Sequence, residues 1–74
     1  MDIKKFLKPG KDIVIEIEEV DYLLDDSAVS SIERGDKKVS LIELYGRQKY
    51  LFDAAVIMDV LEKDGVNDYL DKRD

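Results

Sequence analysis

Residues 38–64 read KVSLIELYGRQKYLFDAAVIMDVLEKD, and this stretch decides the fold. Residues 38–45 and 48–52 are rich in valine, leucine, isoleucine and aromatic side chains, which is typical of strands. The dipeptide Gly46-Arg47 lies between them and predicts a tight hairpin turn. The register that such a turn imposes has two apolar cross-strand pairs, Ile42–Leu51 and Leu41–Phe52.

The second half of the stretch predicts an amphipathic helix over residues 53–64. We expect Asp53 to cap it, because a carboxylate at this position can accept hydrogen bonds from the free amides of the first turn. Gly65 is the expected end of the helix. Apolar residues recur with the spacing i, i+3, i+4 and i+7, at Ala54, Ile57, Met58 and Leu61. This stripe is expected to pack across the sheet.

The N-terminal part predicts a further strand. Ile13, Ile15 and Ile17 alternate with other residues over 12–18, a period of two that places the three isoleucines on one buried face. Residues 20–24 either continue this strand past a bulge or form a second strand.

Residues 27–34 have two interpretations. As a helix, they would begin at a cap on Asp26 or Ser27 and end at Gly35. As a strand, they would form a hairpin through Gly35-Asp36 with residues 38–45. We favour the hairpin, because a helix here would have only two turns and because the hairpin register matches side chains by type. The predicted cross-strand pairs are Glu33–Lys38, Ile32–Val39, Ser31–Ser40 and Val29–Ile42.

The elements together predict a single α+β domain over residues 1–74. Its fold class is an antiparallel β-meander of four to five strands with one C-terminal amphipathic helix packed across it. The expected parts are an N-terminal turn or short helix (1–10), the β-meander (11–52), the helix (53–64) and a short acidic tail (65–74). Exposed strand edges in so small a domain lead us to expect a homodimer.

The composition excludes several kinds of chemistry. The 74 residues include 18 acidic and 12 basic side chains, for a net charge of −6, and contain neither Cys nor His. The chain therefore has no disulfide, no thiolate zinc site and no histidine general base. We expect a protein that is not an enzyme and that binds no cofactor or metal. The longest apolar run is five residues and the N-terminus lacks an apolar signal region, so we expect a cytoplasmic protein outside the membrane.

The acidic character is concentrated in residues 12–26, which carry seven carboxylates and no base. As a functional surface, this segment would bind a protein partner with a basic surface and repel nucleic acid. Such a protein could be an antagonist of a nucleic-acid-handling partner, as in phage or mobile-element accessory proteins. The alternatives are a solvated strand face that prevents edge pairing or a cation site, for which the spaced-ligand loop is lacking. The candidate partner-binding residues are Glu16, Glu18, Glu19, Asp21, Tyr22, Asp25 and Asp26.

Two other functions are considered. Residues 41–61 resemble the ββα endings of LytTR-type DNA-binding domains. They share the order of a strand, a turn at Tyr45-Gly46, a second strand, a capping Asp53 and a helix. Residues 41–47 are also similar to a segment of RemA-type regulators. The resemblance implies a small DNA-binding transcriptional regulator. A meander would hold the bases at its two turns roughly 25 Å apart, which argues against a nucleic-acid partner. These bases are Arg34, Lys37, Lys38, Arg47 and Lys49. The third function is a structural subunit of a larger assembly.

Overall fold

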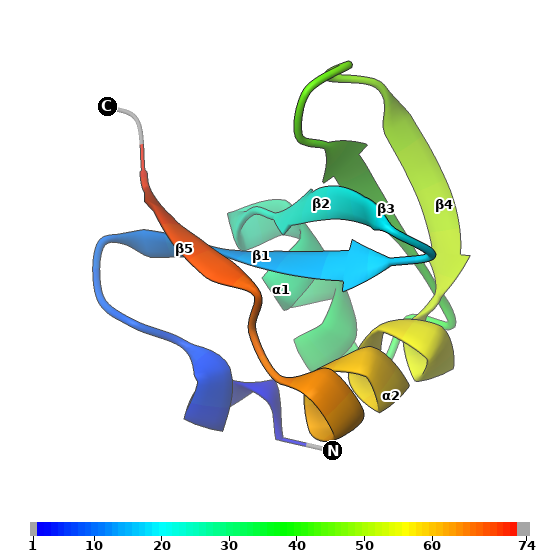
Figure 1. Ribbon diagram of the computed structural model, residues 1–74. Coiled ribbons are helices and arrows are strands. Elements are labelled where there is room, and N and C mark those ends of the chain that lie inside the picture. Colours follow the sequence, from blue (N-terminus) through cyan, green and yellow to red (C-terminus); the bar gives the residue numbers. More distant parts are fainter. Residues whose placement is uncertain (1, 73–74) are drawn as a thin grey trace.

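The computed structural model describes residues 2–72 as a five-stranded antiparallel sheet with two α-helices on one of its faces (Figure 1). The α+β class and the antiparallel sheet are therefore confirmed. The elements in chain order are the 3-10 helix η1 (Ile3–Phe6), β1 (Lys11–Ile17), β2 (Val20–Leu24), α1 (Asp26–Arg34), β3 (Lys38–Glu43), β4 (Lys49–Asp53), α2 (Ala54–Asp64) and β5 (Asp68–Asp71).

The strand order is β4-β3-β2-β1-β5, so the first four strands form a meander. Helix α2 then runs beneath the sheet from β4 at one edge to β5 at the other (Figure 1). The tail expected after the helix is thus wrong for Asp68–Asp71, which pair antiparallel with β1. Tyr69 anchors this strand, because its ring packs against the core and its hydroxyl donates to the Phe6 carbonyl at 2.7 Å. A four-residue strand is too short to show periodicity in the sequence.

Helix α1 replaces the hairpin that we favoured for residues 27–34, and the expectation of a single α-helix is wrong for the same reason. The Asp25 carboxylate accepts from the Ala28 amide at 2.9 Å, one position before the caps that we considered. Gly35 ends the helix with φ of 85° and donates to the Ile32 carbonyl. Tertiary burial stabilises so short a helix, because Ala28, Val29 and Ile32 lie on the face toward the core.

The register of β3 and β4 differs by two residues from the predicted one. Ser40 faces Leu51, and Leu41 faces Tyr50. The connection is longer than a two-residue turn, because the Glu43 amide donates to the Gln48 carbonyl at 2.8 Å. A shift of two residues leaves every side chain on its predicted face of the sheet.

Residues 20–24 form a separate strand, which confirms one of the two alternatives. The core lies between the sheet and the two helices, and the predicted isoleucine alternation and helical stripe are confirmed there. Its buried side chains are Ile3, Ile13, Ile15, Ile17, Leu24, Ala28, Val39, Leu41, Ile57, Met58 and Leu61. The cap expected at Asp53 is only partly right, because Asp53 occupies the N-cap position but makes no side-chain cap bond and instead pairs with Lys38.

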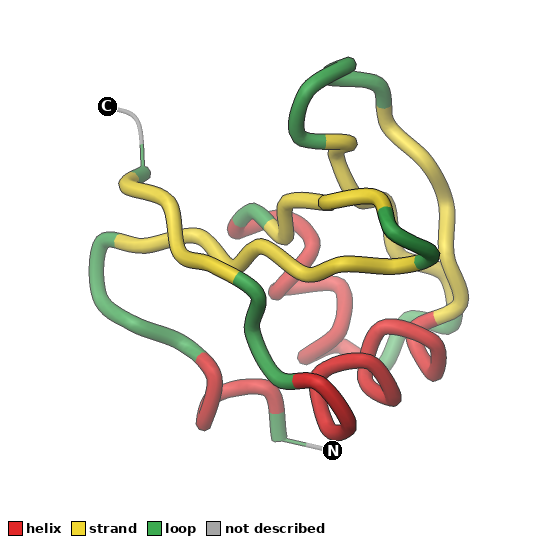
Figure 2. Tube along the Cα trace, viewed as in Figure 1, coloured by secondary structure: helices red, strands yellow, loops and turns green. Residues whose placement is uncertain are grey.

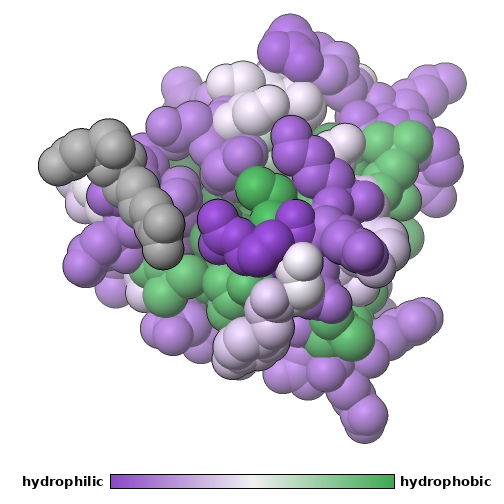
Figure 3. Space-filling view, turned by 90° about the horizontal axis from the view of Figure 1, so that it is seen from above, coloured by the Kyte–Doolittle hydropathy of each residue, from purple (hydrophilic) through white to green (hydrophobic). Residues whose placement is uncertain are grey.

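The opposite face of the sheet has no helix over it within residues 2–72. Figure 3 looks onto this open face and shows hydrophobic residues at its centre, surrounded by hydrophilic ones. Val14 belongs to this face, where it is almost fully buried and lies outside the helix-side core.

Candidate functional site

The structure divides the seven predicted partner-binding residues among three places. Four of them lie at the β1–β2 hairpin end and are called the acidic tip, namely Glu16, Glu18, Glu19 and Asp21. Asp25 and Asp26 lie at the other end of β2, where α1 begins. Tyr22 lies on the helix side of the sheet. The acidic segment is therefore not one continuous surface.

The acidic tip concentrates negative charge without local compensation. Glu16 and Asp21 are direct cross-strand neighbours, and like charges in that position destabilise a sheet. The side chain of Asn67 donates to Asp21 at 3.0 Å. Within the described part of the chain, no Lys or Arg forms an ion pair with any of these four carboxylates.

Asp25 and Asp26 line a hollow of about 450 Å³ on the open face. Asp25 is used as the α1 cap, and Asp26 pairs with Lys72 at 2.8 Å. This bond raises the pKa of Lys72. Burial raises the pKa of Asp12, which lines the same hollow, and the nearby charge of Asp26 raises it further. Asp25 and Asp26 are therefore each bound to another group of the chain, Asp25 to a backbone amide and Asp26 to Lys72.

Tyr22 is half-buried in an aromatic cluster rather than grouped with the acids. Its ring lies 4.8 Å from that of Phe52 and 6.1 Å from that of Tyr50, both edge to face. Burial is the main cause that raises the pKa of its hydroxyl, followed by Tyr50 and Glu43. This placement gives Tyr22 a packing role on the helix side.

A groove between the two helices has a volume of about 630 Å³. We call it the α1–α2 groove. It is lined by Ile32, Gly35, Asp36, Lys37, Asp53, Ala54, Ala55, Val56, Met58, Asp59 and Glu62. The groove was not predicted from the sequence, because one of its two walls, α1, was expected to be a strand.

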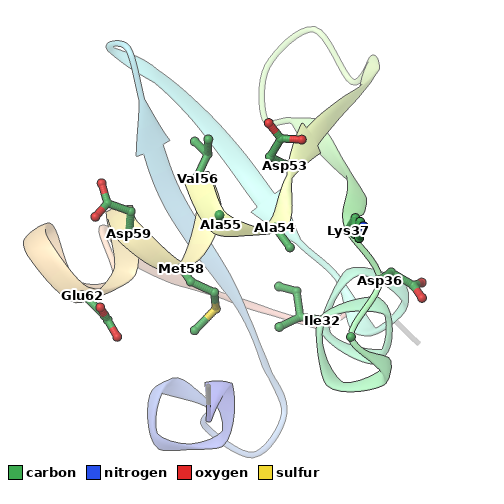
Figure 4. A pocket seen from close by; sticks show the side chains of 11 residues that line it. Ile32, Asp36, Lys37, Asp53, Ala54, Ala55, Val56, Met58, Asp59 and Glu62 are labelled. Atoms are coloured by element: carbon green, nitrogen blue, oxygen red, sulfur yellow. The ribbon is translucent and has the colours of Figure 1, made fainter.

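The α1–α2 groove has an apolar floor and an acidic rim. Figure 4 shows Ile32, Ala54 and Met58 in the middle of the groove and four carboxylates toward its periphery. Val56 leaves 40% of its surface exposed beside them. The rim carboxylates belong to Asp36, Asp53, Asp59 and Glu62, against one lining base, Lys37.

The rim carboxylates can exchange their partners. Asp59 pairs with Lys63 at 3.2 Å, and its side chain is 58% exposed. Asp36 pairs with Arg34 at 2.7 Å, also at the surface. Exposed ion pairs contribute only about 0–1 kcal/mol each, so a cationic ligand would replace them at little cost. Glu62 has no ion pair within residues 2–72.

The basic residues do not form a continuous stripe in the described structure. Lys37 and Lys38 lie at the start of β3, whereas Arg47 and Lys49 lie beyond its other end. Lys38 is paired with a carboxylate, as is Arg34. The two groups of bases are therefore separated by the length of β3, as expected from the sequence.

Acidic clusters and apolar helices are two further features of residues 2–72 that could indicate a function. In that range, no three Asp or Glu side chains are arranged to hold a metal ion. No helix in the same range is long and apolar enough to cross a membrane.

Comparison with protein-family models, with curated proteins and with solved structures finds no match to this chain.

Proposed function

We propose that this protein is a non-catalytic, cytoplasmic binding protein that holds a basic, amphipathic segment of a protein partner in the α1–α2 groove. The observation that carries the proposal is the combination of an apolar floor with a rim of four carboxylates and one lysine. An amphipathic helix binds such a groove through its apolar face, while its lysines and arginines meet the acidic rim.

The two parts of the groove have different physical roles. Apolar side chains buried in a groove supply most of the affinity of an interface. The charged rim selects a basic partner and raises the association rate. The net charge of −6 and the acidic tip add to this attraction at longer range. The lack of His and Cys supports a binding rather than a catalytic role.

A narrower form of the proposal is an antagonist of a nucleic-acid-handling protein. The basic segments of such proteins bind phosphate groups, and the rim carboxylates would occupy the same side chains. In that case the protein and DNA would compete for one partner, and adding the protein to a partner–DNA complex would release the DNA.

Binding can be tested with a fluorescent peptide in which leucines recur with helical spacing and the remaining positions are lysine. We expect this peptide to bind and its counterpart with glutamate in place of lysine not to bind. Affinity for the basic peptide should fall as salt rises. Absence of any binding by the basic peptide would refute the proposal.

The position of the site can be tested by filling the groove. Ala55→Arg places a long cationic side chain in the lining at an exposed helical position, so we expect at least about a tenfold loss of affinity without loss of fold. Ser30→Arg is the matched control, because Ser30 is an exposed position on α1 and does not line the groove. Equal affinity of both variants would exclude the groove.

A second pair of variants separates the groove from the acidic tip. Asp59→Lys/Glu62→Lys and Glu18→Lys/Glu19→Lys make the same change in net charge at different places. We expect the groove variant to lose far more affinity. The opposite order would move the docking surface to the acidic tip.

We propose further that the protein acts as a homodimer. The support is the exposed edge of β4, which carries large apolar side chains at the margin of the sheet. Natural proteins rarely leave such an edge open.

A further inference from the structure

Strand β4 is an edge with the properties of an interface. It pairs with β3 on one side only, and within residues 2–72 no segment lies along its outer side (Figure 2). Leu51 is 65% exposed and Tyr50 is 42% exposed. Strands left open in this way add a further strand readily, because their outer backbone groups have no partner.

The hydrogen bonds of β4 show which residues direct their backbone groups outward. The Glu43 amide donates to the Gln48 carbonyl, and the Ala54 amide donates to the Lys37 carbonyl, both at 2.8 Å. Hydrogen-bonded pairs alternate along an antiparallel ladder, so the even-numbered residues of β4 face β3. The outward-facing residues are therefore Lys49, Leu51 and Asp53.

We propose that β4 of a second copy pairs antiparallel with this edge, about a two-fold axis at Leu51. The inference rests on the homodimer proposed above and shares one residue, Asp53, with the rim of the α1–α2 groove. In this register Leu51 lies opposite Leu51 of the second copy, and the outward backbone N–H and C=O groups of the two leucines hydrogen-bond to each other. Lys49 lies opposite the partner's Asp53, and the backbone groups of these two residues also point outward and can pair.

The side chains of β4 are self-complementary in that register. On the open face, Lys49 meets the partner's Asp53, which already lies beside Lys38 in its own chain. The result is a row of alternating charges on either side of the leucine pair. On the helix face, Tyr50 meets the partner's Phe52. The aromatic clusters of the two copies thereby become continuous.

The other edge lacks such an apolar anchor. The short strand β5 begins at Asp68 and ends at Asp71. Within residues 2–72, neither Tyr69 nor Leu70 is exposed to the extent of Leu51, so β5 offers a second copy less apolar surface. Pairing through β4 alone gives a closed two-fold dimer rather than a growing fibre.

Cysteine cross-linking tests the register, because the natural chain contains no Cys. Residues in a hydrogen-bonded antiparallel pair have Cα atoms about 5.5 Å apart, within the range of a disulfide. We expect Leu51→Cys to form a covalent dimer on oxidation. Lys49→Cys is the matched control, since the Cα atoms of its two copies would lie about 14 Å apart. Mixing Lys49→Cys with Asp53→Cys should restore the cross-link between the two variants.

Light scattering tests the interface without a covalent bond. We expect the natural chain to have the mass of a dimer and Leu51→Lys to have that of a monomer, with unchanged far-UV circular dichroism. Leu7→Lys makes the same substitution at an exposed position outside β4 and should remain dimeric. A monomeric natural chain would refute the homodimer altogether. A dimer that Leu51→Lys leaves intact and Leu51→Cys does not cross-link would refute the β4 edge alone. Peptide binding in the groove is measured with separate variants, so a failure of the dimer and a failure of the groove are distinguishable.

Discussion

The β1–β2 turn carries two glutamates in a backbone conformation that disfavours them. Ile17 pairs with Val20, so the connection contains only Glu18 and Glu19. Their φ angles are 51° and 67°. Positive φ at both central residues defines the type I′ turn, in which Asn-Gly is the preferred sequence. We expect Glu18→Asn/Glu19→Gly to stabilise the protein.

The magnitude follows from two opposing effects. A residue with a Cβ atom in the left-handed region costs about 1–2 kcal/mol. Glycine at position 19 removes that cost. It also lowers the free energy of unfolding by about 0.5–1 kcal/mol, because it makes the unfolded chain more flexible. The net gain of the double substitution is about 1 kcal/mol, with asparagine adding a small part of it. For a domain of this size, 1 kcal/mol corresponds to a rise in Tm of about 4–8 °C.

Thermal and urea unfolding, followed by far-UV circular dichroism, measure the effect. Glu18→Gln/Glu19→Gln is the matched control, because it removes the same two charges next to Glu16 and Asp21 but keeps the Cβ atoms. We expect the control to gain clearly less than Asn-Gly. An equal gain in both variants would show that charge repulsion, rather than backbone conformation, destabilises the natural turn. A lower stability of Glu18→Asn/Glu19→Gly than of the natural chain would refute the reasoning.

Three further predictions concern stability. Asp25→Ala should lower the free energy of unfolding by about 1 kcal/mol in urea titrations, because the first turn of α1 loses its cap. Tyr69→Phe should cost about 1 kcal/mol by the same assay and leave the Phe6 carbonyl without its donor. Burial and the charge of Asp26 raise the pKa of Asp12, so ionisation of Asp12 costs more in the folded than in the unfolded state. This penalty grows as the pH rises from the pKa of Asp12 in the unfolded chain through its pKa in the folded chain. Asp12→Asn should therefore raise the urea midpoint at pH 7 but not at pH 3.

Much of the fold follows from local pattern. The isoleucine alternation in β1, the strand pattern of β3 and β4 and the apolar stripe of α2 all depend on spacing within one element, which the sequence displays directly. The Gly35 stop signal for α1 was visible as well, but a nine-residue helix and a strand explain residues 27–34 almost equally well. Burial of Ala28 against the sheet decides between them, and that burial exists only in the folded chain.

The candidate docking surfaces show the same division. The sequence by itself determined that the chain is acidic, lacks His and Cys and concentrates carboxylates in residues 12–26. Only the tertiary structure decided that these carboxylates separate along β1 and β2, and that Asp59 and Glu62 instead border an apolar groove beside Ile32. Charge and composition are properties of residues one at a time, whereas a groove or a free edge depends on which distant segments become neighbours. That choice is made by the packing of two helices on one face of the sheet and by the pairing of β5 with β1.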